Sequence, residues 1–300
     1  MKLYAPAYYK EFSCIADRCT HSCCIGWEID VDQDTFAFYQ SLDGEYAQHI
    51  RASIEGGAQP HFALAAHDRC PHLDSHGLCR IIKAYGKDAL CEICREHPRF
   101  YHDTLHGKEA GLGLCCEEAC RIVLGSDAFA DMILLGEATG GSVMQDFDAT
   151  APRAQIFAWL LDAALSYPQK LQRLQDCFGV SPASLDDAAW RSLLQDLEYL
   201  DPAHRALFAC YSCNVTAPVH AEPMLTRALA YFVYRHCSAA YDQFDFCANL
   251  GLALFFERLL CSLICTGHDV YDAARILSEE LEYSEDNTDT IRSVFEEVLS

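Results

Sequence analysis

Residues 14–27, CIADRCTHSCCIGW, carry Cys14, Cys19, Cys23 and Cys24 in the spacing C-x4-C-x3-C-C. A core helix or strand does not need so many thiols so close together. Soft thiolates are instead the ligands that zinc and iron–sulfur clusters require. We therefore expect the chain to be organised around a thiolate metal site that begins in this stretch.

The composition indicates a folded protein that keeps its thiols reduced. The chain has 300 residues, of which 51% are hydrophobic and 18 are cysteines. This length and apolar content suffice for the core of two domains or of one large domain, which argues against disorder. The opening residues, MKLYAPAYYKEF, lack the apolar run and cleavage site of a signal peptide. We expect a cytoplasmic protein whose cysteines serve metal or redox chemistry rather than disulfides.

The charge and the apolar segments limit the classes of partner. A formal net charge of −22 argues against nucleic acid, whose phosphates call for a basic surface. Residues 126–300 hold 10 basic and 26 acidic residues, which indicates solvated helix faces or a surface that attracts a lysine-bearing partner. Residues 250–265, LGLALFFERLLCSLIC, carry Glu257 and Arg258 at their middle and fall short of the roughly 20 residues that a bilayer requires. They predict a buried core helix and no membrane partner.

The two parts of the chain differ in composition. Eleven of the 18 cysteines and nine of the 13 histidines precede residue 121. From residue 153 onward, apolar residues recur at helical spacing. We predict a mainly α protein with a Cys-rich metal-binding region of short strands or hairpins over residues 1–125 and an all-helical domain over 126–300. Residues 134–141, LLGEATGG, lack the strand–helix context of a nucleotide-binding loop and predict an interhelical loop.

Several local elements follow from the pattern. Residues 28–34 alternate polar and apolar and predict a short strand, followed by a helix over 36–42 that Asp34 or Thr35 caps. Turn residues between Cys70 and Cys79 predict a hairpin-like return. Cys91 and Cys94 are three residues apart on a predicted helix and therefore share a face. Further helices are predicted over residues 171–178, 188–200, 202–213, 223–241, 244–266, 269–282 and 290–299.

The cysteine spacing leaves the kind of metal site open. Cys91 and Cys94 form the one C-x2-C pair of the first 120 residues that could serve as a zinc knuckle, and a second such pair is missing. The ferredoxin and radical-enzyme spacings are also missing. Adjacent Cys23 and Cys24 suit a cluster better than one tetrahedral zinc ion.

Other cysteines and histidines have alternative interpretations. His21, His72 and His76 lie beside the Cys groups and are candidate ligands, although a surface or hydrogen-bonding role is the commoner one. The cysteines of the second half predict buried thiols that act as small hydrophobic side chains. These are Cys177, Cys210, Cys213, Cys237, Cys247, Cys261 and Cys265.

As an ordered set, the motifs of residues 4–124 resemble those of the flagellin lysine-N-methylases. The set departs from the family pattern at Glu117, where the family tends to have proline, and Cys91, Cys115 and Cys120 are additional cysteines. The matching pieces are Tyr8 and Phe12 before Cys14-x4-Cys19-x3-Cys23-Cys24-Ile-Gly-Trp27, then Cys70-Pro-His-Leu-Asp74, Gly77-Leu-Cys79-Arg-Ile, Cys94-Arg95-Glu-His-Pro98-Arg99-Phe100 and Cys116-Glu-Glu-Ala-Cys-Arg121.

This resemblance implies a methyltransferase with a metal cofactor. The implied reaction moves methyl groups from S-adenosylmethionine to lysine amines of flagellin. The implied centre is a cysteine-bound [4Fe–4S] cluster, with zinc as the alternative because the first motif is also similar to a zinc- or iron-chelating CxxxCC group. A single cluster needs four of the eight cysteines at family positions, and the choice among them stays open. The eight are Cys14, Cys19, Cys23, Cys24, Cys70, Cys79, Cys94 and Cys116.

Lysine methylation also requires a proton acceptor. Lysine has an ordinary pKa of about 10.4, so an enzyme must lower that pKa or supply a base. The family hypothesis puts the cleft at the junction of the two regions, with Tyr8, Tyr9, Tyr101 and Glu28 as candidate bases, although core packing is the commoner role of such tyrosines. Two rival functions stay open: a non-catalytic iron- or zinc-binding protein, and a scaffold that docks on flagellin without chemistry.

Overall fold

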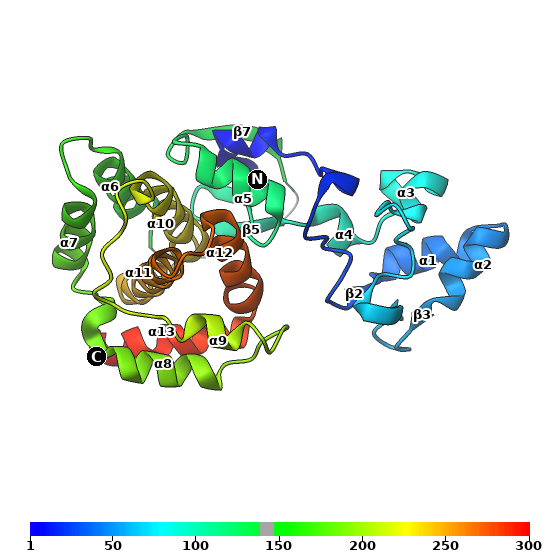
Figure 1. Ribbon diagram of the computed structural model, residues 1–300. Coiled ribbons are helices and arrows are strands. Elements are labelled where there is room, and N and C mark those ends of the chain that lie inside the picture. The colour runs from blue at the N-terminus through cyan, green and yellow to red at the C-terminus, as the bar shows by residue number, and fades with distance from the viewer. Residues whose placement is uncertain (139–146) are drawn as a thin grey trace. The chain divides into compact units, whose positions relative to one another are not determined.

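The structure is a computed structural model that describes residues 1–138 and 147–300 (Figure 1). The described residues are mainly α-helical, as predicted. They form two compact units: unit 1 comprises Met1–Phe12 and Phe100–Ser300, and unit 2 comprises Ser13–Arg99. This division differs from the predicted one near residue 125, because the N-terminal strand and the segment after residue 99 build the sheet of unit 1.

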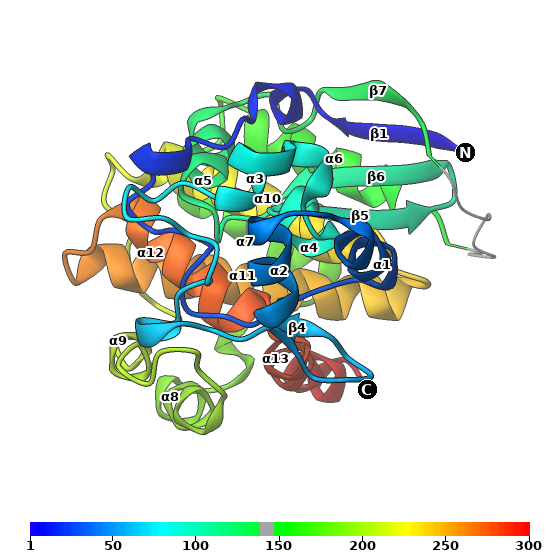
Figure 2. The same cartoon turned by 90° about the vertical axis from the view of Figure 1, so that its right-hand side faces the viewer.

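Unit 1 contains a four-stranded sheet in the order β5-β6-β1-β7 (Figure 2). Strand β1 pairs in parallel with β6 and antiparallel with β7. Strand β7 shows that the region after residue 126 is not all-helical, contrary to the prediction. It also occupies most of the described part of residues 134–141, which were predicted to be an interhelical loop. Residues 139–141 lie outside the described part. The strands are β1 (Lys2–Pro6), β5 (Arg99–Thr104), β6 (Gly107–Leu112) and β7 (Met132–Glu137).

The helices of unit 1 surround α11, which contacts α10, α12 and α13 (Figure 1). The predicted helix over 202–213 is mostly wrong, because the amides of Ser212 and Cys213 donate to the side chains of Ser262 and Asp187 instead of to helix carbonyls. The helices are α5 (Glu117–Gly125), α6 (Thr150–Leu161), α7 (Tyr167–Phe178), α8 (Asp187–Asp196), α9 (Arg205–Phe208), α10 (Glu222–Cys237), α11 (Gln243–Cys265), α12 (Val270–Leu277) and α13 (Glu285–Leu299), with a π-helical segment at Ser278–Glu282.

Helix α11 is the one described helix that is long and apolar enough to cross a membrane. Its most apolar 18-residue window is 89% buried inside the protein. Glu257 and Arg258 at its middle form an ion pair of 2.5 Å between Oε2 and Nε, and Tyr167 donates a hydrogen bond to Glu257. These contacts satisfy the charges that the sequence places in this apolar segment. The predicted core helix is therefore confirmed.

Unit 2 is built from short elements around a smaller core. Strands β2, β4 and β3 form an antiparallel sheet in that order. The core contains Ile29, Tyr39, Ile50 and Phe62 together with cysteines. The elements are β2 (Ile29–Asp30), α1 (Gln33–Ser41), α2 (Glu45–Ala52), β3 (Ile54–Glu55), β4 (His61–Phe62), α3 (Arg80–Tyr85) and α4 (Glu92–Glu96), with short 3-10 turns at Ala16–Arg18, Ala66–Asp68 and Lys87–Ala89.

The start of α1 differs from the prediction. The strand predicted over residues 28–34 is reduced to β2, and the helix begins at Gln33 rather than at residue 36. Its N-cap is Asp32, whose Oδ1 accepts a hydrogen bond of 2.9 Å from the amide of Thr35. Asp34 and Thr35, the predicted caps, therefore lie in the first turn. Asp32 is an equally good capping residue, and the sequence pattern alone does not separate the three.

Candidate functional site

Five cysteines meet in the core of unit 2. Cys70 and Cys91 are buried there, and Cys24, Cys79 and Cys94 pack against it with partial burial. The backbone joins two of the segments directly, because the amide of Cys70 donates a 2.8 Å hydrogen bond to the carbonyl of Cys24. Three separate stretches of the sequence, at residue 24, residues 70–79 and residues 91–94, thus contribute thiols to one core.

The segment between Cys70 and Cys79 folds back on itself, as predicted. Oδ1 of Asp74 accepts hydrogen bonds from the amides of His76 at 2.8 Å and Leu78 at 2.9 Å. Gly77 adopts the left-handed backbone conformation that this return requires, with φ of +74°. An isolated antiparallel bridge between Leu73 and Cys79 closes the return. The turn therefore brings Cys79 back toward the core that holds Cys70.

Helix α4 presents Cys91 and Cys94 together. Cys91 is the N-cap residue, and the two thiols share a hydrogen bond. Oδ2 of Asp32 accepts the amide of Glu92 at 2.8 Å, which ties the start of α4 to the start of α1. The hydroxyl of Tyr39 lies 3.7 Å from Sγ of Cys91 and donates to the carbonyl of Ala89. Both thiols are therefore held in position by neighbouring elements.

Burial and hydrogen bonds between thiols shift the pKa values of these cysteines in both directions. Burial raises the pKa of Cys70 to about 12. In the Cys91–Cys94 pair, the shared hydrogen bond lowers the pKa of Cys91 and raises that of Cys94. A hydrogen bond from Cys23 lowers the pKa of Cys24 to about 7. Metal binding requires thiolates, and a positively charged metal group would offset the cost of gathering them in one core.

The other predicted ligands lie elsewhere. Cys14 and Cys23 are exposed, and the half-buried Cys19 donates from Sγ to the carbonyl of His21 at 3.2 Å. Cys116 belongs to unit 1, where it is the N-cap of α5. In residues 1–138 and 147–300, no three His, Cys, Asp or Glu side chains converge on a single ion position. The structure thus gathers thiols in a core without a preformed site for one ion.

Cys91 is the residue that the family pattern missed. It counted as an additional cysteine, yet it is 1% exposed and lies among Cys24, Cys70, Cys79 and Cys94. The signal that identifies it is the C-x2-C spacing with Cys94. Spacing therefore gave the better guide at this position than the match to family motifs.

The histidines near the Cys groups make hydrogen bonds. His72 is fully buried, with Nδ1 3.1 Å from the hydroxyl of Tyr46 and Nε2 3.0 Å from Oγ of Ser53. Both ring nitrogens are therefore engaged, which favours the hydrogen-bonding role over metal ligation. Nδ1 of His21 lies 2.9 Å from Oγ1 of Thr20, and His76 is exposed.

The cysteines of the second half follow the prediction in part. Cys237, Cys247 and Cys261 are buried, and Cys210 and Cys213 are half-buried. The prediction is wrong for Cys177 and Cys265, which are exposed. Both lie in the last turn of a helix, α7 and α11 respectively, where a side chain can leave the packed face.

The candidate bases differ in burial and belong to both units. Tyr8 is 1% exposed, and burial raises its pKa well above the ordinary value, so core packing describes its role. Tyr9 packs against the same core, whereas Tyr101 is exposed on β5. Glu28 belongs to unit 2, where its Oε1 lies 3.4 Å from Nδ1 of His61.

Unit 1 contains a buried polar network that the sequence analysis did not find. The Glu282 carboxylate, in the π-helical segment, accepts hydrogen bonds from the hydroxyls of Tyr231 at 2.8 Å and Ser278 at 2.5 Å. Nε2 of His236 lies 3.0 Å away, and Nε of Arg235 lies 3.4 Å away. Burial raises the pKa of Glu282, but Arg235 and His236 hold it below the usual value. With its oxygens fully engaged, this carboxylate stabilises the fold.

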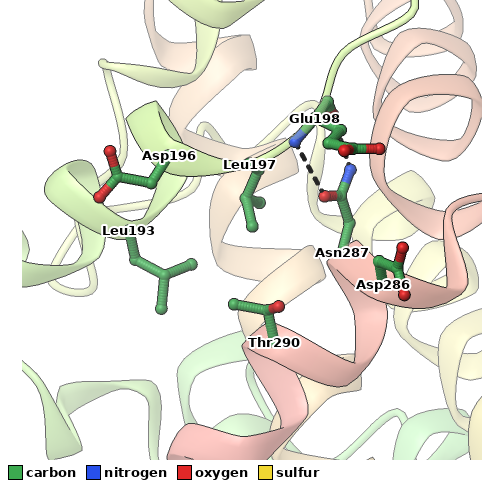
Figure 3. A pocket seen from close by; sticks show the side chains of 7 residues that line it. All are labelled: Leu193, Asp196, Leu197, Glu198, Asp286, Asn287 and Thr290. Atoms are coloured by element: carbon green, nitrogen blue, oxygen red, sulfur yellow. Dashed lines mark hydrogen bonds between the residues drawn. The ribbon is translucent and has the colours of Figure 1, made fainter.

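Two cavities open on unit 1, each with a volume of about 420 Å³. The first lies between the end of α8 and the start of α13 (Figure 3). The second lies along α7, beside α6. The first is lined by Leu193, Asp196, Leu197, Glu198, Asp286, Asn287 and Thr290, and the second by Trp159, Gln169, Gln172, Arg173, Asp176 and Cys177.

Comparison with known proteins gives three relatives. Over 161 residues, the chain is 30% identical to proteins named Lysine-N-methylase from Salmonella typhimurium and Salmonella choleraesuis, covering 49% of this chain and 37% of each relative. Over 146 residues, it is 30% identical to the flagellar biosynthetic protein FliU of Salmonella muenchen, covering 44% of this chain and 80% of that protein. No protein-family model matches the chain, and no solved structure matches it at a significant level. The chain therefore matches little more than a third of the length of the two lysine-N-methylases.

Proposed function

Because this chain belongs to the flagellin lysine-N-methylase family, we propose that it is a protein-lysine N-methyltransferase that acts on flagellin. The proposed methyl donor is S-adenosylmethionine. The names of the relatives support the reaction type and the flagellar link. The proposed location is the cytoplasm, where thiols stay reduced. The observation that carries the cofactor is the group of five thiols in the core of unit 2.

We propose that four of these five thiols hold a [4Fe–4S] cluster, with zinc as the alternative metal. Thiolates are the ligands of both centres, so the donor set fits either. The resemblance of the cysteine motifs to those of the flagellin lysine-N-methylases implies the cluster, which we therefore propose ahead of zinc. With four cysteine ligands every iron would be closed, and the bound cluster would supply structural support. An open iron position for the amino-carboxylate of the methyl donor would require that only three of the thiols bind.

The proposed transfer breaks the methyl–sulfur bond of the donor as a bond forms between that methyl carbon and the lysine nitrogen. The products are S-adenosylhomocysteine and methyl-lysine, and one proton leaves the amine. Lysine must enter as the neutral amine, so a nearby group must accept that proton. Of the candidate bases, Tyr101 and Glu28 are exposed enough to meet a substrate, whereas Tyr8 is not.

The test begins with the metal. Anaerobically purified protein is analysed for iron, zinc and acid-labile sulfide, and its visible absorption is recorded. Methyl transfer from labelled S-adenosylmethionine to flagellin is measured on the same sample. Iron and sulfide in equal amounts, with transfer, would support the proposal. Metal without methyl-donor binding or transfer would favour the rival function of a non-catalytic metal-binding protein.

Variants of single cysteines locate the ligands. We expect Cys70→Ser and Cys91→Ser to lose most of the bound metal, because both side chains are buried in the thiol core. Cys177→Ser is the matched control, since Cys177 is exposed on α7 in unit 1. Unchanged metal content in both core variants would refute the assignment of the site to this core.

A further inference from the structure

The cavity between α8 and α13 combines an apolar floor with an acidic rim. Figure 3 shows Leu193 and Leu197 from the end of α8 facing Thr290 of α13. In the same view Asp196 stands at one side of the opening, and Glu198 and Asp286 stand at the other. A ligand that matches this lining has an aliphatic body and a positive charge.

The walls of this cavity are held in place by a buried side chain. Asn287 is 2% exposed and joins the two helices. Its Oδ1 accepts the amide of Glu198 at 3.1 Å, and its Nδ2 donates to the carbonyls of Glu198 at 2.7 Å and Glu280 at 3.0 Å. These bonds connect the start of α13 to the residues that follow α8, which are the two walls of the cavity.

The carboxylates of the rim are available to a ligand. In the part of the chain that the structure describes, none of Asp196, Glu198 and Asp286 forms an ion pair, and all three are exposed. Their neighbours do have partners, since Glu280 pairs with His204 at 2.6 Å and Asp289 with Arg292 at 3.8 Å. The three rim carboxylates therefore keep their charges open to a bound cation, as other exposed carboxylates without an ion pair do, and it is their position around one cavity that sets them apart.

Helix electrostatics point to a cationic ligand. Asp196 is the last residue of α8, and Glu198 follows two residues later. Carboxylates near a helix C-terminus oppose the helix dipole, so a bound cation would relieve this repulsion. Asp286 stands in the first turn of α13, where an acidic residue is ordinary, and its position alone indicates no ligand.

We propose that this cavity binds a lysine side chain of the protein substrate. The proposal rests on the proposed function, which makes a lysine-bearing protein the partner. The four-carbon stem of lysine packs on Leu193 and Leu197 while its ammonium meets the carboxylates. Nearby carboxylates favour the charged form of an amine, whereas methyl transfer needs the neutral form. The cavity is therefore a docking subsite, distinct from the place where the reacting lysine is methylated.

The test uses two peptides that differ in one charge. One carries a single lysine within a neutral Ser/Gly sequence, and the other carries norleucine, which has the same aliphatic stem. Fluorescence anisotropy measures the binding of each to the full chain. We expect the lysine peptide to bind about threefold to fivefold more tightly, which is what one exposed charge pair of good geometry gives. In the triple variant Asp196→Asn, Glu198→Gln, Asp286→Asn this preference is lost.

A matched control separates the cavity from the overall negative charge. The triple variant Asp43→Asn, Asp131→Asn, Glu297→Gln removes the same charge at other exposed positions and should keep the preference. An equal loss in both triple variants, or equal binding of the two peptides to the unmodified chain, would overturn the proposal.

Methyl transfer to flagellin is assayed in parallel. Normal transfer by the cavity variant with an unchanged KM would also refute the docking role and leave the proposed function standing. Failure of the unmodified chain to transfer methyl groups would count against the proposed function alone, because the peptide measurement decides the cavity separately.

Discussion

At the scale of single residues, buried charges of unit 1 are held by several partners each. Glu282 has no exposed side-chain surface and contacts Tyr231, Ser278, Arg235 and His236. Removing one member of a buried ion pair leaves the other charge without compensation, which costs about 3–5 kcal/mol. Such residues are expected to dominate the response of unit 1 to mutation.

We therefore predict that Glu282→Gln lowers the free energy of unfolding by about 3 kcal/mol at pH 7, since Arg235 stays buried and charged. Urea denaturation measures this change. The exposed Glu297→Gln serves as the control and should change the same quantity by less than about 0.5 kcal/mol. Because the pKa of Glu282 is lowered in the folded protein, its contribution is complete above about pH 4.3 and fades as the pH falls further. An equal difference at pH 7 and pH 3 would contradict this account.

His102 gives a second prediction, which concerns how the free energy of unfolding changes below pH 7. Burial, followed by the charges of Arg235, His236 and Arg153, lowers its pKa to about 3, and its Nε2 is buried without a hydrogen-bond partner. An unfolded histidine titrates near pH 6.5, so unfolding between about pH 6.5 and 3 takes up close to one proton here. This contribution to stability is present above about pH 6.5 and declines below it.

The variant His102→Gln should therefore flatten the dependence of the unfolding free energy on pH by close to one proton near pH 5. Urea denaturation across a series of buffers from pH 7 to pH 4 measures the slope. The exposed His76→Gln is the matched control and should leave the slope unchanged. Equal slopes in His102→Gln and in the unmodified chain would show that this side chain does not stay neutral when folded.

At the scale of elements, α11 is the central support of unit 1. Phe256 on this helix is fully buried and packs against Phe232 of α10 and against His236. Phe244, near the start of the same helix, is 40% exposed. Phe256 and Phe244 therefore represent a buried and a partly exposed position on the same helix.

Phe256→Ala is expected to lower the free energy of unfolding by about 3–5 kcal/mol, because it leaves a cavity in a packed core. Phe244→Ala should lower it by less than about 1 kcal/mol, since much of that ring is already in water. Thermal or urea unfolding compares the two. Equal effects would mean that α11 is not the core helix described here.

At the scale of the whole molecule, the two units differ in the size of their cores. The core cluster of unit 2 has nine buried residues, two of which are cysteines, whereas that of unit 1 extends over many helices. Small cores usually need an additional constraint such as a metal. The proposed metal should therefore stabilise unit 2 far more than unit 1.

Removal of the metal from the intact chain is predicted to speed hydrogen exchange in unit 2 selectively. Amides of α1, α3 and α4 should lose protection by tenfold or more, because binding to the folded form alone stabilises it by mass action. Amides of α10 and α11 should keep their protection. Exchange followed by mass spectrometry measures both regions in one sample, and equal loss in the two units would contradict a metal confined to unit 2.

The candidate site was predictable in part. The resemblance to the family motifs named Cys24, Cys70, Cys79 and Cys94 among eight candidate ligands, and these four lie in or against the core of unit 2. The sequence did not separate these from Cys116, which lies in unit 1. That distinction depends on the strand that precedes Cys116, since β6 pairs with β1 and so belongs to unit 1. Two strands that lie more than a hundred residues apart in the sequence leave no sign of their pairing in either segment.

The sequence alone determined the helical character of most of the second half, the burial of α11 and the turn at Asp74. Each of these features depends on the spacing or the composition of residues within a single short segment. The tertiary structure alone decided that β7 is a strand, that Cys116 lies outside the unit of the thiol core and that carboxylates from the end of α8 and the start of α13 share a cavity. These features arise only when distant segments meet, because burial and strand pairing depend on both segments in contact and cannot be read from the sequence of one.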